Sequence, residues 1–170
     1  DVYKRQAAAL RAQGFAVTKE NAITKEPPTV DVVVANPPFS PEGDLVYEAQ
    51  GVTTRHRDHA ISLQAIKSLK ENGVAVLIIA TRGLNQEGYD KKRAYVKADV
   101  RDFYEYIYQA YDVTHFFTVS GDLYAKQGAE YPVDVIVLRP ISTVPMGEKI
   151  PMPWQREPRS FDTWKDIRDV

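Results

Sequence analysis

The run Val30-Asp31-Val32-Val33-Val34-Ala35, which leads directly into Asn36-Pro37-Pro38-Phe39, decides how this chain is expected to fold. A short, almost wholly apolar and valine-rich run is typical of a strand buried on both faces of a parallel sheet. The two prolines end the strand, because each fixes its own φ and restricts the residue before it to extended geometry. Open α/β sheets hold their ligands outside the carboxyl ends of such strands. We therefore expect a rigid, ligand-binding loop at residues 36–39.

The rest of the chain supplies the helices and strands that such a sheet needs. Helical spacing of apolar residues, or an alanine-rich composition, predicts helices over 4–13, 59–71 (ended by Asn72-Gly73), 98–111 and 161–168. Apolar runs predict strands over 15–18, 74–80, 113–119 and 133–138. The strand over 74–80 is expected in the centre of the sheet, and the last two as an antiparallel hairpin at its edge. Residues 40–54 read as a long loop, and Tyr104, Tyr106 and Tyr108 as exposed or boundary positions of their helix.

Composition limits the classes of protein to which the chain can belong. It has 170 residues, 44% of them hydrophobic and 26% charged, which is enough chain for one globular core. A formal net charge of −1 means that any contact with nucleic acid must come from local patches. Zero cysteines exclude disulfides, cysteine-based zinc sites and zinc deaminase chemistry, and no metal site is expected. With no membrane-spanning stretch and no secretory signal, we expect a cytoplasmic protein that does not associate with membranes.

The chain is expected to divide into two parts. Residues 1–140 hold the elements of the sheet, whereas proline is frequent over residues 141–170 and predicts an extended tail, with its short last helix docked through Trp164. The opening Asp-Val-Tyr-Lys-Arg-Gln, residues 1–6, has no methionine and resembles a translated sequencing-adapter scar. We therefore expect these six residues to be artefactual and the chain to be a piece of a longer protein.

Asn36-Pro37-Pro38-Phe39 resembles the catalytic motif of methyltransferases that modify exocyclic amino groups, above all adenine N6, in which Asn, Asp or Ser precedes Pro-Pro and an aromatic residue. Residues 69–79 match the family's Leu-Lys-x-x-Gly strand, and residues 121–137 resemble the hairpin of γ-type adenine-N6 enzymes. The similarity looks closest to the methylase module of strawberry-notch-like helicase–methylase fusions of phages and plasmids. It covers about residues 6–140. It implies an α/β fold that is part of a Rossmann-like methyltransferase, with a mostly parallel sheet and a terminal antiparallel hairpin, and it implies DNA and a larger polypeptide, with a fused helicase, as partners.

The chemistry of adenine N6 explains why the family uses such a loop. The amino nitrogen is a poor nucleophile because its lone pair is delocalised into the ring. The Asn36 side-chain oxygen and the Pro37 backbone carbonyl can accept its two hydrogens and favour a more tetrahedral nitrogen. Phe39 offers a flat face for a base extruded from the duplex, an interaction typically worth about 1–3 kcal/mol. The alternative is a Pro-Pro turn that only ends the strand and places Phe39 in the core.

The resemblance implies S-adenosylmethionine as the cofactor. Asn21 and Ala22 fall where the family contacts the cofactor's adenine, usually through an aspartate, and Asn36 is expected beside the cofactor as well. Family members also need a Gly-rich turn after the first strand and an acidic residue at the end of the second. No two of the nine glycines here are separated by a single residue. We therefore expect the chain to be the catalytic half of the enzyme, without its cofactor half and inactive by itself.

Other residues are candidates for contacts to DNA. The resemblance implies a second aromatic residue opposite Phe39 on the flipped base, and Tyr124 is the position expected for it, with Phe117 and Tyr131 as alternatives. Arg55 and Arg57 lie between the motif and the next helix and could contact phosphate. For each of these residues the alternative is an ordinary covering or solvated side chain.

Three functions follow as hypotheses. The first is a site-specific DNA adenine-N6 methyltransferase of a restriction-modification type. The second is an RNA or protein-glutamine methyltransferase, because those families use the same kind of loop. The third is a non-catalytic DNA-docking or anti-restriction module beside a helicase.

Overall fold

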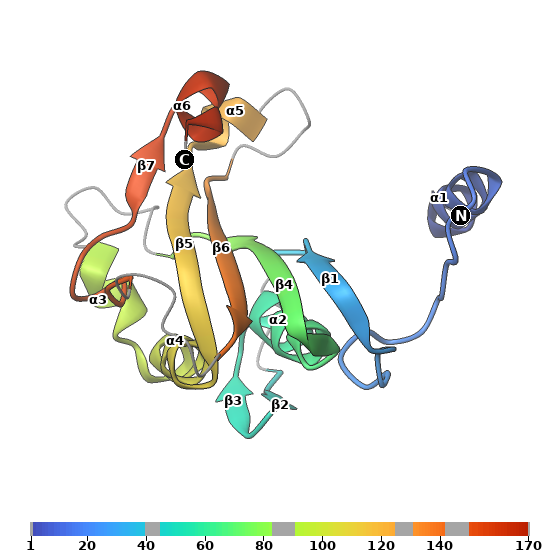
Figure 1. The fold of residues 1–170 in the computed structure, drawn as a ribbon, viewed down its shortest axis with the longest axis horizontal. Coiled ribbons are helices and arrows are strands. Elements are labelled where there is room, and N and C mark those ends of the chain that lie inside the picture. Colours follow the sequence, from blue (N-terminus) through green and yellow to red (C-terminus); the bar gives the residue numbers. More distant parts are fainter. Residues whose placement is uncertain (1, 40–44, 83–90, 125–130, 142–149, 170) are drawn as a thin grey trace.

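A computed structural model describes residues 2–39, 45–82, 91–124, 131–141 and 150–169 (Figure 1). Its centre is a five-stranded mixed sheet with strand order β1-β4-β6-β5-β7. Strand β1 is parallel to β4, β6 is antiparallel to both β4 and β5, and β7 is parallel to β5, so only β6 opposes the others. The five strands are Val30–Ala35 (β1), Leu69–Ala80 (β4), Tyr111–Val119 (β5), Val133–Pro140 (β6) and Arg159–Phe161 (β7). The predicted α/β class is confirmed, and the sheet, expected to be mostly parallel with a terminal antiparallel hairpin, is mixed.

Six helices and a small hairpin complete the described part of the chain. The helices are Val2–Ala12 (α1), Arg57–Ile66 (α2), Lys91–Tyr95 (α3), Ala98–Ala110 (α4), Gly121–Tyr124 (α5) and Trp164–Arg168 (α6). The hairpin consists of Tyr47–Ala49 (β2) and Val52–Thr54 (β3). Helix α1 stands apart from the other elements in Figure 1. Within the described ranges, no helix has the length and apolar character needed to cross a membrane.

The core lies between one face of the five-stranded sheet and the helices α2 and α4. Val33 and Ala35 of β1 are level with Ala75 and Leu77 of β4, and all four are buried. Because side chains alternate along a strand, these residues share one face of the sheet. The helical side chains packed with them are Leu63, Ile66, Val100, Phe103 and Ile107.

The opposite face of the sheet is also apolar but is open over β1. Val32 and Val34 are 59% and 66% exposed, and they lie level with half-buried Val74 and Val76 of β4. The same face continues across the sheet through Ile78, Val135, Val137 and Phe117. The prediction that β1 is buried on both faces is therefore wrong for one face in the described part of the chain, because α2 and α4 both pack on the other.

The first half of the chain departs from the sequence prediction at three places. No strand forms over residues 15–18, where Phe15 is 58% exposed and no neighbouring strand is paired with it. The segment 40–54 is not simply a loop, because it contains the hairpin β2–β3. Helix α2 ends at Ile66 rather than at residue 71, because the backbone N–H and hydroxyl of Ser68 bond back to Ala65 and its carbonyl then pairs with Val30. Gly73 therefore does not end a helix: it is buried in β4, where a Cβ would lie 3.0 Å from the Asp31 carbonyl oxygen.

The second half of the chain departs from the prediction in how the sheet is completed. Strands β5 and β6 pair antiparallel as predicted, but β6 lies inside the sheet and β5 is flanked by β7. The predicted extended tail thus contributes a strand, anchored by buried Phe161, whereas Trp164, the residue expected to dock the last helix, is 51% exposed. Tyr104 is fully buried rather than exposed, since its hydroxyl and ring pack against Asp134 and Phe116.

Candidate functional site

The Asn-Pro-Pro-Phe loop leaves the sheet at the carboxyl end of β1, next to the carboxyl end of the parallel strand β4. The alternation of buried and exposed side chains along β1 continues into the loop. Asn36 and Pro38 are exposed, Pro37 is buried and Phe39 is half-buried. Phe39 is not part of the core cluster. Pro37 thus anchors the loop, while Asn36 and Pro38 face outward, where a ligand could reach them.

A cavity of about 450 Å³ lies beside this loop. Its size falls within the range typical of small-molecule sites. Four segments that are distant in sequence build it: a turn before β1, the proline loop, the start of the β2–β3 hairpin and the first turns of α2. The lining residues are Asn21, Ala22, Ile23, Pro38, Leu45, Tyr47, Arg57 and Ile61.

The turn that carries Asn21 is held by its own hydrogen bonds. The Asn21 side-chain oxygen accepts from the Ile23 N–H at 2.9 Å, and the Asn21 carbonyl accepts from Lys25 N–H at 2.9 Å. Gln64 of α2 then donates to the Lys25 carbonyl at 2.8 Å, which fastens the turn to the helix. The Asn21 oxygen retains a second lone pair and the amide retains two N–H donors, so this group could still read the edge of a nitrogenous ring.

Helix α2 presents Arg57 and Ile61 to the same cavity. The two residues are four positions apart, a spacing that places side chains on one face of a helix. Arg57 gives the cavity a positive charge, and Ile61 adds to an apolar lining that includes Ile23 and Leu45. The cavity therefore combines one arginine and one amide with an otherwise apolar and aromatic wall, which suits a flat heterocycle.

The structure brings some of the predicted site residues together and not others. Asn21, Ala22, Pro38 and Arg57 line the cavity, whereas Asn36, Pro37 and Phe39 are adjacent in the loop without lining it. Arg55 is exposed between β3 and α2. The side chain of Tyr124, the last residue of α5, lies outside the described residues.

The two alternatives to Tyr124 lie in different surroundings. Phe117 packs edge-on against Phe161 with ring centroids 5.4 Å apart, on the open face of the sheet. Tyr131 is 61% exposed. Sequence reasoning missed Ile23, Leu45, Tyr47 and Ile61 as lining residues. Only the spacing of Ile61 from Arg57 gave a signal for any of them.

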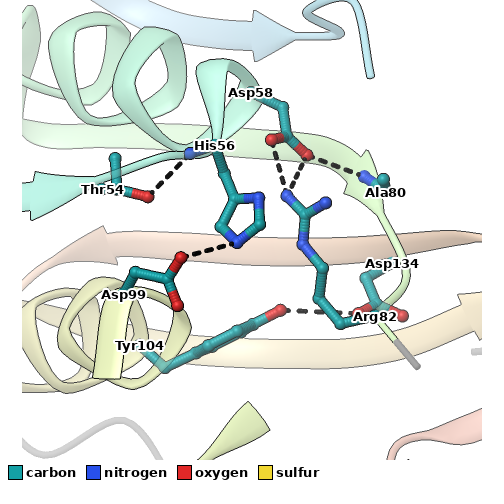
Figure 2. A network of polar contacts seen from close by, with 8 residues as sticks. All are labelled: Thr54, His56, Asp58, Ala80, Arg82, Asp99, Tyr104 and Asp134. Carbon is teal, nitrogen blue, oxygen red and sulfur yellow. Dashed lines mark hydrogen bonds and ion pairs between the residues drawn. The ribbon is translucent and has the colours of Figure 1, made fainter. Parts of the chain in front are cut away.

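A buried polar network joins α2 to the end of β4 (Figure 2). Asp58, which is 1% exposed, accepts hydrogen bonds from Arg82 at 2.6 and 2.8 Å and from the Ala80 N–H at 3.1 Å. His56 precedes α2 and its Nε2 lies 3.3 Å from Asp99 Oδ2 in the first turn of α4. Burial lowers the pKa of His56, the Arg82 charge lowers it further, and Asp99 partly opposes both.

A second buried carboxylate, Asp134, gathers hydroxyl groups from several elements. It accepts from Thr81 and Thr118 at 2.8 Å each and from Tyr95 at 2.6 Å, with Tyr104 at 3.4 Å. Burial raises the pKa of both tyrosines, and the neighbouring carboxylate raises each further, so their hydroxyls remain donors. Both carboxylates accept several hydrogen bonds from protein donors and act as structural ties between the elements around them.

Other features of the described residues do not add chemistry to the site. In the described ranges, no three acidic, histidine or cysteine side chains converge in a way that could hold a metal ion. A smaller cavity of about 270 Å³ lies at the start of β4 and β5 and the end of β6, and its lining includes Glu71, Asp112 and Arg139 but none of the predicted site residues.

Comparison with known proteins leaves the site to be interpreted from its own chemistry. No protein-family model matches the chain, and no curated protein matches its sequence significantly.

Proposed function

We propose that this chain is the catalytic-loop part of a DNA adenine-N6 methyltransferase, with the cofactor-binding half supplied by a larger polypeptide. One observation carries the proposal: the Asn-Pro-Pro-Phe loop follows a parallel strand at the sheet edge, and its Pro38 shares a cavity with Asn21 and Arg57. The order of the elements gives further support. A strand, a proline loop, a helix, a second parallel strand, a helix and an antiparallel pair follow one another as the resemblance implies.

The residues of the cavity fit the adenine end of S-adenosylmethionine. The turn at Asn21–Ala22 offers an amide and backbone groups beside the apolar side chain of Ile23, as an adenine ring requires. No Gly-rich turn exists in the sequence to hold the rest of the cofactor. When bound, S-adenosylmethionine would supply an electrophilic methyl group.

The chain's own residues would prepare the amino group and position the base. The Asn36 side-chain oxygen and the Pro37 carbonyl would accept the two hydrogens of the adenine amino group, which localises the nitrogen lone pair. Exposed Asn36 is accessible for this role, and buried Pro37 fixes the backbone that carries the second acceptor. Phe39, which is half-buried, would support one face of the flipped base.

The open apolar face of the sheet also supports the idea that a further part of the protein is needed. Val32 and Val34 leave a hydrophobic surface exposed beside the proposed catalytic loop. Strands that are apolar on both faces are normally covered on both. A cofactor-binding half that packs here would bury this surface and complete the site.

The test is methyl transfer by the polypeptide that contains both halves, with Asn36→Ala as the variant and Asn72→Ala as the matched control. Asn72 is an exposed asparagine near the amino end of β4, at the end of the strand away from the proline loop. We expect Asn36→Ala to lower kcat by about 100-fold or more, because a preorganised hydrogen-bonding group in a transition state is worth that much, while circular dichroism stays unchanged. Asn72→Ala should keep full activity. Unchanged activity of Asn36→Ala would falsify the proposal.

The alternative functions are separated by the methyl acceptor. Labelled S-adenosylmethionine is incubated with DNA, RNA and protein substrates side by side. Label in RNA or protein alone would replace the DNA assignment. No label in any acceptor, from a protein that carries both halves, would favour a DNA-docking or anti-restriction module.

A further inference from the structure

The hairpin β2–β3 begins at Tyr47, eight residues after Phe39 of the proline loop. Its three residue pairs are closed by a two-residue turn in which Gln50 (φ 55°) and Gly51 (φ 75°) both adopt left-handed backbone conformations. This is the turn whose twist best matches that of the paired strands. Ala49 and Val52 flank the turn and are both buried in the main core. The non-glycine residue at positive φ is tolerated because the packing on either side fixes the hairpin.

Tyr47 begins this hairpin at the end away from the turn. It pairs with Thr54, which is fully buried and accepts the His56 N–H at 3.1 Å just before α2 begins. The position of Tyr47 is thus fixed by the core on one side and by the start of α2 on the other. Its half-buried side chain lines the cavity that also contains Asn21 and Pro38.

We propose that Tyr47 forms an aromatic wall against which an adenine ring stacks in this cavity. Asn21 would pair with the edge of the ring, since an asparagine amide can bond adenine at N6 and N7. The choice of adenine rests on the proposed function. Two molecules could bring the ring, S-adenosylmethionine or the extruded nucleotide of DNA.

The test uses the 170-residue chain and adenosine at millimolar concentration, followed by amide chemical-shift mapping. We expect shifts centred on Ala22, Ile23 and Tyr47, and clearly smaller shifts with uridine. Shifts that are absent, or centred elsewhere, overturn the proposal. This arm requires only the unmodified chain, so it decides the matter even if a variant fails to fold.

Variants at position 47 test the stacking itself. Tyr47→Leu should weaken adenosine binding by about 5- to 100-fold, the usual effect of removing an aromatic stacking partner. Tyr47→Phe should bind within about threefold of the original chain, because it keeps the ring. Tyr106→Leu is the control, since Tyr106 is a half-buried tyrosine of α4 that does not line the cavity. Equal binding by Tyr47→Leu and the control overturns the role of Tyr47.

The source of the ring is decided by two further titrations, one with S-adenosylmethionine alone and one with an adenine-containing oligonucleotide. Shifts at Ala22 and Tyr47 with the first identify a cofactor site, and with the second a target-base site. Failure of this inference is distinguishable from failure of the proposed function. If the chain binds adenosine but the protein with both halves transfers no methyl group, the adenine site stands and the proposed function is refuted. If methyl transfer is lost in Asn36→Ala but kcat and KM are both unchanged in Tyr47→Leu, the proposed function stands and the role of Tyr47 is refuted.

Discussion

Replacing His59 with phenylalanine should remove part of the acid sensitivity of the fold. His59 is fully buried in α2, and neither of its ring nitrogens has a hydrogen-bond partner among the described residues. Its ring stacks on Phe103 with centroids 4.1 Å apart and planes 12° from parallel. Burial lowers the pKa of His59 well below its ordinary value of 6.5, and the positive charge of Arg82 and the nearby His56 lower it further. The folded chain therefore holds this imidazole neutral.

The size of the effect follows from proton linkage. The unfolded chain protonates residue 59 as the pH falls through 6.5, whereas the folded chain does not. The stability that His59 contributes is therefore fully present above its unfolded pKa and is lost as the pH falls below it. Between about pH 7.5 and about pH 5.5, this loss amounts to about 1.4 kcal/mol for one such histidine. When the pH is lowered over this interval, the free energy of unfolding of His59→Phe should therefore fall by about 1.4 kcal/mol less than that of the original chain.

Urea unfolding at the two pH values measures the difference. The comparison is between pH values within each protein, so any cost of packing the larger phenylalanine cancels. His56 also has a lowered pKa and also makes the fold less stable at acid pH, but it contributes to the pH dependence of both proteins. Ser62→Ala is the matched control, because it removes from the same helix a buried hydroxyl that has no hydrogen-bond partner in the described part of the chain, without removing a titrating group. The reasoning is refuted if His59→Phe loses as much stability on acidification as the original chain.

Two further predictions concern the buried carboxylate and the open face of the sheet. Asp134→Asn should lower the free energy of unfolding by about 2–5 kcal/mol, because one amide oxygen cannot accept all the hydroxyls that the carboxylate accepts. Tyr95→Phe removes a single donor and should lower the free energy of unfolding by less. Equal losses for the two variants in urea unfolding would contradict this reasoning. Val34→Thr keeps the β-branched shape of a residue that is 66% exposed, so it should reduce the binding of a hydrophobic fluorescent dye while shifting the melting temperature by no more than a few degrees. Unchanged dye fluorescence would mean that the open face is not the exposed hydrophobic surface of the chain.

The main elements could be predicted because their signals are local. The run over β1, the run over the second half of β4 and the amphipathic pattern of α4 each carry enough apolar residues to define type and position. The antiparallel pairing of β5 with β6 follows from their closeness in sequence. Their place within the sheet could not be predicted in the same way. The strand that pairs with the outer side of β5 is only three residues long and comes from a proline-rich segment some twenty residues after β6.

Other features depend on contacts that no local pattern encodes. Asn72-Gly73 has the composition of a helix stop, yet the glycine lies in β4, where a Cβ would crowd Leu69 and Lys70 of the same strand and the Asp31 carbonyl of β1. Tyr104 has the same sequence context as Tyr106 and Tyr108, but it alone reaches the buried carboxylate of Asp134 and is drawn into the core. In both places the long-range neighbour, rather than the helix or strand propensity, decides the outcome.

The same distinction applies to the candidate site. The proline loop was identifiable because four consecutive residues make up the motif. The cavity was only partly identifiable, since its lining comes from segments that meet through the fold. Tyr47 lies in a stretch whose strands are three residues long, too short for a periodic pattern, and it was read as loop. The resemblance suggested Asn21 and Ala22, and the structure places both in one cavity with Pro38.

Helix α2 links the candidate site to the stability of the fold, and this decides which substitutions are informative. Arg57 lines the cavity, while the next residue, Asp58, is buried and bound to Arg82 and to the end of β4. Adjacent residues on a helix point in different directions, so one turn serves both roles. Removing Asp58 would leave a buried guanidinium unpaired and move the wall of the cavity at the same time. Loss of binding in such a variant would therefore not identify a ligand contact. Asn36 is an exposed residue of the proline loop, so its substitution reports more directly on the site itself.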